Sequence, residues 1–165
     1  MIVYLVGMPG SGKSVVGKEL AGRLGVPFVD LDDQIEREAG KPIREIFAED
    51  GEPAFRAIEA QVLTKAAAGD PSVVACGGGV VIEPANRVTL RATGHVVFLD
   101  VPVEILRRRV RPAAERPLIH AEGDLERLLA EREPMYREFS SHVVDGSGTP
   151  GEVAAAIERE LRGST

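Results

Sequence analysis

The sequence predicts an α/β fold in which a parallel sheet lies between two layers of helices, a three-layer sandwich. Short apolar runs rich in β-branched residues alternate along the chain with amphipathic stretches of helical period. Strands that alternate with helices favour parallel pairing through right-handed crossovers. Runs that are apolar at every position, such as Val96–Leu99, are typical of strands covered on both faces. Because the 165 residues contain neither an internal repeat nor a linker, we expect a single domain over residues 1–165.

The apolar runs define the expected strands, and the stretches between them define the expected helices. The strands are Ile2–Val6, Pro27–Asp30, Ser72–Cys76, His95–Val101 and Ser141–Asp145. The helices are Lys13–Leu24, Gln34–Ala39, Ile43–Ala48, Glu52–Ala68, Pro84–Ala92, Val103–Val110, Asp124–Arg137 and Pro150–Leu161. The segment from Arg111 to Gly123 contains two prolines and mixed charges between two helical patterns, and it is expected to form a lid.

The composition excludes several classes of protein. Hydrophobic residues make up 44% and charged residues 28%, which is typical of a globular chain and not of a disordered one. The net charge of −6 disfavours broad nucleic-acid binding, and no apolar run approaches the roughly 18 residues that span a membrane. The first residues lack the basic flank of a signal peptide, and the single cysteine, Cys76, suits a reducing compartment. We therefore expect a cytoplasmic protein and, without an obvious exposed apolar stripe, a monomer.

The strongest motif is Gly7–Ser14, which matches G-x-x-x-x-G-K-[ST] between a predicted strand and a predicted helix. Glycines allow backbone N–H groups to converge on phosphate oxygens, and the N-terminus of the following helix adds partial positive charge. Lys13 would reach the β- and γ-phosphates, and the Ser14 hydroxyl would ligate Mg²⁺. A dinucleotide fingerprint is excluded because Val15 stands where its third glycine is needed. The motif predicts a nucleoside-triphosphate site.

Carboxylates follow the second strand, where the carboxyl ends of a parallel sheet face the ligand crevice. Asp30 and Asp32, two residues apart, can serve a metal-bound water and a substrate hydroxyl. Asp33 with Glu36 is interpreted as a helix-capping box. Asp100 superficially resembles a metal-binding aspartate, but we expect it to cap the helix that starts near residue 102.

Other features are weak when each is taken alone. The triplet Gly77–Gly79 ends the third strand, so it is either a tight turn or a backbone left bare for a ligand. Arg56, Arg116 and Arg132 would ordinarily be solvated surface residues, Arg56 pairing with Glu52 or Glu59 along its helix. Arginines cluster between residues 107 and 137, which favours fork-shaped recognition of phosphate or carboxylate.

Taken together and in order, these motifs resemble shikimate kinase over essentially the whole chain. The motifs are Gly7–Ser14, Asp30-Leu31-Asp32, Phe55-Arg56-x-x-Glu59, Gly77-Gly78-Gly79, Arg116-Pro117-Leu118 and Arg132-x-Pro134-x-Tyr136. The resemblance implies the P-loop fold of nucleoside monophosphate kinases, a five-stranded parallel sheet of order 2-3-1-4-5 with a lid over about residues 111–123. It also implies an acceptor-binding region over about residues 30–60, and transfer of the γ-phosphoryl group of ATP, with Mg²⁺, to the 3-hydroxyl of shikimate in aromatic amino acid biosynthesis.

The resemblance also implies roles for individual residues. Asp32 would bind the shikimate hydroxyls and orient or deprotonate the attacking one, while Asp30 would help Ser14 to hold Mg²⁺. The remaining acceptor contacts would come from Phe47, Phe55, Arg56, Gly77, Gly78, Gly79 and Arg132, the two arginines clamping the carboxylate. The remaining ATP contacts would come from Gly10, Ser11, Gly12, Lys13, Val15, Arg108, Arg116, Thr149 and Pro150. Lys13, Asp32 and Arg116 would carry catalysis, Arg116 closing over the γ-phosphate.

The chain departs from the family pattern at two places. Val15 stands where many members have a threonine, so no hydroxyl faces the α-phosphate from this position. The loop from Asp145 to Pro150 lacks basic side chains for the adenine. Two other interpretations remain open at this point. One is a gluconate or nucleoside monophosphate kinase of the same fold, and the other is a non-catalytic nucleotide-binding regulator, which would not need Asp32.

Overall fold

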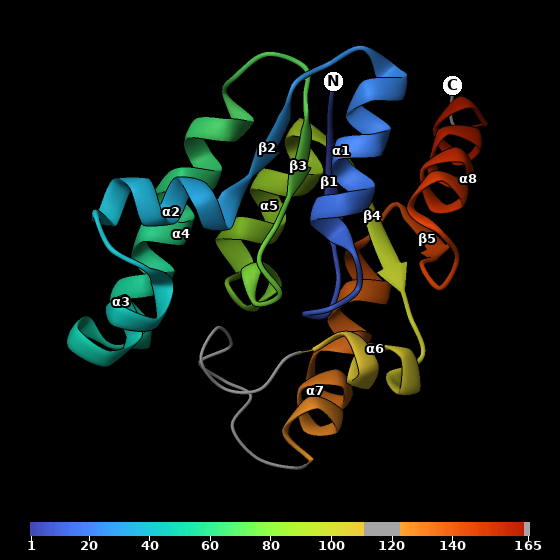
Figure 1. Cartoon of the computed structure of the whole chain (residues 1–165). Helices are drawn as coiled ribbons and strands as arrows, with labels where there is room; N and C mark the ends of the chain where they lie inside the picture. Colours follow the sequence, from blue (N-terminus) through green and yellow to red (C-terminus); the bar gives the residue numbers. More distant parts are fainter. Residues whose placement is uncertain (111–122, 164–165) are drawn as a thin grey trace.

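One parallel sheet forms the centre of the computed structural model, which describes residues 1–110 and 123–163 (Figure 1). Its strands lie in the order β2-β3-β1-β4-β5. Their bounds are β1 Ile2–Val6, β2 Phe28–Asp30, β3 Val73–Ala75, β4 Gly94–Asp100 and β5 His142–Asp145. All four pairings are parallel. The strand β1 lies in the centre, between β3 and β4. The predicted fold class and strand order are confirmed.

Helices cover both faces of the sheet. They are α1 Lys13–Leu24, α2 Leu31–Ala39, α3 Ile43–Asp50, α4 Glu52–Ala67, α5 Pro84–Thr93, α6 Val103–Arg109, α7 Asp124–Phe139 and α8 Pro150–Arg162. A short 3₁₀ turn at Val80–Ile82, which the sequence did not predict, follows the glycine triplet. Most predicted ends are within two residues of these bounds, but α2 begins three residues earlier than expected.

Alternate residues of the central strand enter two separate cores. Tyr4 and Val6 of β1 belong to the core formed with apolar side chains of α2, α4, α5 and α7, whereas Val3 and Leu5 belong to the core formed with those of α1 and α8. Figure 1 shows α1 and α8 side by side on one face of the sheet. Every residue of β1 is therefore buried, as predicted for a strand covered on both faces.

Two capping expectations are wrong. The residue that precedes α2 is Asp30, whose carboxylate accepts hydrogen bonds from the amides of Asp32 and Asp33. Because the helix follows the strand directly, the cap lies at the strand end and Asp33 is already helical. Asp100 does not cap α6, since it is still in β4 and its Oδ2 accepts a hydrogen bond from Arg137 Nη2 at 2.6 Å.

Two further expectations concern regions that the sequence singled out. The lid expected over residues 111–123, and with it Arg116, lies outside the described residues except for Gly123, which precedes α7. In the parts of the chain that are described, no helix combines the length and apolarity needed to cross a membrane.

Candidate active site

The phosphate loop connects β1 to α1 at the carboxyl edge of the sheet. Gly10 (φ 84°) and Gly12 (φ 92°) have left-handed backbone conformations, which glycine adopts without strain. The Lys13 ammonium folds back over the loop and donates to the carbonyl of Gly7 at 2.5 Å. Ser11 is less available than predicted, because its amide donates to the Met8 carbonyl and its hydroxyl is buried. The loop thus holds a lysine and glycine amides in the arrangement of a phosphate cradle.

Ser14 and Asp30 lie together, as the predicted metal pair requires. The Ser14 hydroxyl donates to Asp30 Oδ2 at 2.7 Å, and Asp30 Oδ1 caps α2. A hydroxyl and a carboxylate beside a phosphate loop fit Mg²⁺, which binds one or two protein oxygens and completes its shell with waters and phosphate. The described residues contain no group of three or more His, Cys, Asp or Glu side chains arranged for a metal, so any ion here would depend on such a shared shell.

A cavity of about 320 Å³ extends from the phosphate loop towards the end of β3. Asp30, Asp32 and the exposed side chain of Val15 line it. Cys76 lies at its base, where burial raises the pKa of the thiol and makes the thiolate unfavourable. The prediction of a small buried cysteine is confirmed. The lining places a carboxylate, Asp32, in the same cavity as Lys13.

Three arginines are consecutive at residues 107–109, and Arg109, not Arg108, contacts the phosphate loop. Arg109 lines the cavity and donates to the carbonyl of Gly10 at 3.4 Å, whereas Arg108 donates to the carbonyl of Glu104 within α6. Thr149 and Pro150 are exposed and form the N-terminal cap and first turn of α8. They do not line the cavity.

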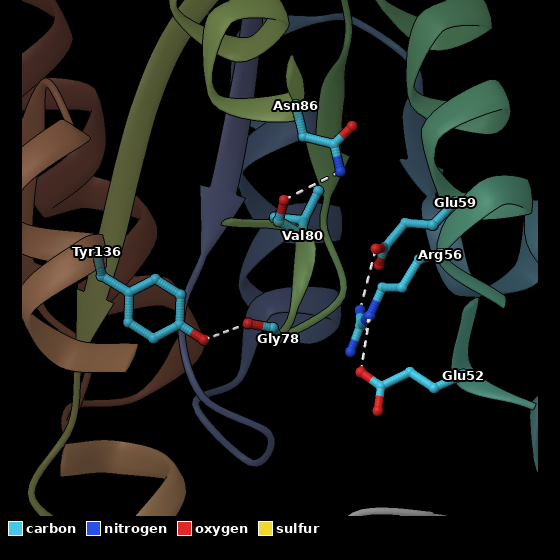
Figure 2. A network of polar contacts seen from close by, with 7 residues as sticks. All are labelled: Glu52, Arg56, Glu59, Gly78, Val80, Asn86 and Tyr136. Carbon is cyan, nitrogen blue, oxygen red and sulfur yellow. Dashed lines mark hydrogen bonds and ion pairs between the residues drawn. The ribbon is translucent and has the colours of Figure 1, made fainter. Parts of the chain in front are cut away.

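Arg56 lies on the buried face of α4, unlike an ordinary surface arginine. Its Nη1 donates to Glu59 Oε1 at 3.0 Å and its Nε donates to Glu52 Oε2 at 3.3 Å (Figure 2). The expected pairing along the helix is confirmed, but the expectation of a solvated side chain is wrong, because only 10% of it is exposed. The ring of Phe55 lies 5.0 Å from the guanidinium and 4.8 Å from the ring of Phe47. Packing against the Phe55 ring, which Phe47 supports, helps to hold the guanidinium in place.

Glu59 belongs to this site, although the sequence analysis gave it no role of its own. Its carboxylate is 1% exposed, and Oε2 has no hydrogen-bond partner in the described residues. Burial raises the pKa of Glu59, and the positive charge of Arg56 opposes that rise. The signal for it was present in the sequence, since Glu59 is a charged residue within the apolar face formed by Phe55 and Val62.

Arg132 of α7 is the second buried arginine and is 4% exposed. Within residues 1–110 and 123–163 no carboxylate lies close enough to form an ion pair with it, although the charge of Glu59 and the hydroxyl of Tyr136 both interact with its guanidinium. Burying a guanidinium without a carboxylate partner is costly unless an anion supplies the compensating charge. The environment of Arg132 therefore fits an anionic ligand.

Charged side chains surround the glycine triplet, which explains why its backbone is bare. A Cβ at Gly77 would lie 3.1 Å from both Asp32 Oδ1 and Glu59 Oε2. A Cβ at Gly78 would lie 3.1 Å from Arg132 Nη1, and one at Gly79 would overlap the Arg56 guanidinium. The triplet therefore brings together side chains from three helices. It does more than make a tight turn.

The arrangement suits one kind of reaction. The phosphate cradle and Asp32 share one cavity, and the two buried guanidinium groups lie against the adjoining glycines, Arg132 at Gly78 and Arg56 at Gly79. The guanidinium groups can bind a small carboxylic acid, the carboxylate can bind a hydroxyl, and the cradle can present a phosphoryl group to that hydroxyl.

Comparisons with known proteins point to one family. The family model described as "Shikimate kinase" matches residues 9–162. A shikimate kinase from Aromatoleum aromaticum is 43% identical, over 98% of this chain and 95% of its own length. Another from Halorhodospira halophila is 46% identical, over 98% and 93%.

Solved structures agree with these sequence matches. A shikimate kinase from Acinetobacter baumannii in complex with shikimate has a TM-score of 0.95 at 36% identity, covering 99% of this chain and 94% of its own. The shikimate kinase of Aquifex aeolicus has a TM-score of 0.90 at 33% identity, covering 99% and 98%. A sugar kinase from Janibacter has a TM-score of 0.62 at 23% identity, which shows a shared fold alone.

Proposed function

The chain belongs to the shikimate kinase family, and on this premise we propose how its residues phosphorylate the 3-hydroxyl of shikimate with ATP. The observation that carries the proposal is the pair of buried guanidinium groups at the glycine triplet, Arg132 near Gly78 and Arg56 near Gly79. Shikimate is a small carboxylic acid with several hydroxyls, so it needs a fork for the acid and a carboxylate for a hydroxyl. Arg56 and Arg132 provide the first, and Asp32 provides the second. Phe47 and Phe55 would line the ring pocket, and the amides of Gly77, Gly78 and Gly79 would face the acceptor.

The nucleotide would bind at the other end of the cavity. The amides of Gly10, Gly12 and Lys13 would surround the β-phosphate, and the Lys13 ammonium would neutralise developing charge on the transferred group. Ser14 and Asp30 would hold Mg²⁺, which when bound neutralises the charge of the phosphates. Arg116 keeps its proposed role over the γ-phosphate on the Arg116-Pro117-Leu118 motif alone.

Transfer then depends mainly on position. Asp32 would accept a hydrogen bond from the 3-hydroxyl, orient its oxygen towards the γ-phosphorus and take up its proton as the new bond forms. Arg56 and Arg132 would keep the ring in place through its carboxylate. Asp32 lines the same cavity as Lys13 and approaches Gly77, beside the glycines that the two arginines contact, which suits this division of labour.

One residue beside the nucleotide differs from the sequence-based expectation. Arg109 contacts the phosphate loop, so we propose that it flanks the nucleotide, in the place first assigned to Arg108. The backbone of Thr149 and Pro150 would flank the adenine. Val15 would give the nucleotide an apolar contact only. We further propose that the enzyme acts in the cytoplasm, since its single cysteine is unpaired and suits a reducing compartment. We also propose that it is a monomer, since its sequence has an acidic net charge and no obvious exposed apolar stripe.

The direct test measures ADP release with ATP and Mg²⁺ and one acceptor at a time. We expect release with shikimate, and none above background with gluconate, with nucleoside monophosphates or without acceptor. Arg56 and Arg132 match a single carboxylate, whereas a nucleotide acceptor would need further phosphate-binding groups. Faster turnover of gluconate or a nucleotide would refute the acceptor assignment, and no turnover with any acceptor would favour the regulator.

A second prediction concerns Glu59. Glu59→Gln keeps the shape of the side chain but removes the charge that holds Arg56, so the KM for shikimate should rise about tenfold with little change in the KM for ATP. Glu52→Gln is the matched control, because Glu52 pairs with the same guanidinium but is 43% exposed. An exposed pair contributes little, so its KM should change less than about twofold.

The pH dependence of this effect has a definite sign. Burial raises the pKa of Glu59, so the wild-type carboxylate takes up its proton at a higher pH than an ordinary glutamate. Below that pKa the wild type also lacks the charge. The ratio of the two KM values, Glu59→Gln to wild type, should therefore be largest above the raised pKa of Glu59 and fall towards one as the pH drops below it. A ratio independent of pH would contradict the anchoring role.

A further inference from the structure

Tyr136 reaches the glycine triplet from the opposite side to Arg56 (Figure 2). It lies on α7, one helical turn after Arg132, and is completely buried. Its ring is stacked on Phe98 of β4 with centroids 5.0 Å apart. Its hydroxyl donates to the carbonyl of Gly78 and also interacts with the Arg132 guanidinium, so the Gly79 resonance, and not the KM alone, tests its effect on the peptide. Stacking on a residue of the sheet fixes the ring, so the hydroxyl is a rigid support for that carbonyl.

The carbonyl of Gly78 and the amide of Gly79 belong to one peptide group. The structure contains no cis peptide bond among its described residues, so this C=O and this N–H point in opposite directions. With the carbonyl directed to Tyr136, the Gly79 amide points to the side of Arg56. It has no hydrogen-bond partner in the described part of the chain. An amide beside a guanidinium is available to an oxygen of a bound anion.

A second support holds the same segment further along. Asn86 of α5 is buried, and its Nδ2 donates to the carbonyl of Val80 at 3.1 Å. The carbonyls of Gly78 and Val80 are thus both held by side chains from helices that do not carry Arg56. Glycine has the widest choice of backbone conformation, so a Gly-Gly peptide needs such supports to keep one orientation.

We propose that Tyr136 is a positioning residue, whose hydroxyl sets the orientation of the Gly78–Gly79 peptide and so presents the Gly79 amide to the acceptor. The inference deepens the proposed function and rests on its assignment of Arg56, Arg132 and the glycine triplet to the acceptor. The hydroxyl keeps its proton under assay conditions, because burial raises the pKa of Tyr136 to about 12 against the opposing charge of Arg132.

The test compares two tyrosine variants. Tyr136→Phe removes only the oxygen and retains the stack on Phe98. Tyr4→Phe is the matched control, because Tyr4 is also completely buried and its hydroxyl makes one hydrogen bond, to Thr93 Oγ1 at 2.6 Å, away from the cavity. Both variants should lose some thermal stability. Only Tyr136→Phe should raise the KM for shikimate, by about five- to tenfold, with the KM for ATP within about twofold of wild type.

A spectroscopic readout does not depend on turnover. The ¹H–¹⁵N resonance of the Gly79 amide should move in Tyr136→Phe and stay in place in Tyr4→Phe, because only the first variant frees the peptide. An Arg56→Ala variant distinguishes failure of the positioning role of Tyr136 from failure of the proposed acceptor site. If Arg56→Ala raises the KM for shikimate but Tyr136→Phe alters neither that KM nor the Gly79 resonance, positioning by Tyr136 is refuted while the proposed site stands. If Arg56→Ala also leaves the KM unchanged, both are refuted.

Discussion

Replacing Lys13 with alanine is expected to lower kcat by about 10³-fold or more, since removal of one preorganised donor to a developing anion already costs about 10²–10³. Its ammonium is held over the loop by the carbonyl of Gly7, at 2.5 Å. A charge already in place needs no reorganisation during transfer, and phosphoryl transfer depends chiefly on such charges. Rapid-quench measurement of a single turnover would detect the loss directly.

The control for this substitution lies on the same helix. Lys18 is exposed on α1 and lies over the ring of Phe28, outside the cavity. Lys18→Ala removes the same charge from the same element and should leave kcat within about twofold. Isothermal titration with ATP should show weaker binding for the Lys13 variant only. A kcat for Lys13→Ala within threefold of wild type would disprove its role at the phosphates.

The phosphate loop and the strand-end carboxylates were predictable because their signals are local. A glycine-rich turn between a buried strand and a helix fixes where Lys13 and Ser14 lie, and parallel strands bring Asp30 to the same edge. The predicted position of the α2 cap was wrong because it rested on the local sequence alone. Asp33 has the local sequence of a cap, but β2 passes into the helix without a loop, so Asp30 takes that position.

The acceptor side was not predictable from local sequence. Arg56 and Arg132 each have the neighbours of a surface arginine, and only the packing of α4 and α7 around the glycine triplet buries them. Resemblance to a family supplied these residues. The contacts of Tyr136 and Arg109 could not be predicted because their partners are distant in the sequence. The hydrogen bond from Tyr136 to the Gly78 carbonyl joins residues 58 positions apart, and the one from Arg109 to the Gly10 carbonyl joins residues 99 positions apart.

Asp32→Asn is expected to lower kcat by about 10²–10⁴-fold, the usual contribution of a positioned proton acceptor. Asp32 lies in the first turn of α2 and lines the cavity that Lys13 also lines, and its Oδ1 approaches Gly77, next to the glycines that face Arg132 and Arg56. Its neighbour Asp33 is exposed and serves as the matched control. Asp33→Asn removes the same charge near the same helix end, so it controls for that electrostatic effect. Because Asp33 does not line the cavity, its replacement should leave kcat within about twofold.

The comparison with Asp32→Ala separates the two possible contributions of this carboxylate. Asparagine still offers a carbonyl oxygen that can orient the 3-hydroxyl, but it cannot take up the proton, whereas alanine does neither. If proton uptake matters most, both variants will be equally slow in single-turnover assays. If orientation matters most, asparagine will retain much of the activity that alanine loses. A kcat within threefold of wild type for both variants would remove Asp32 from the mechanism and reopen the regulator interpretation.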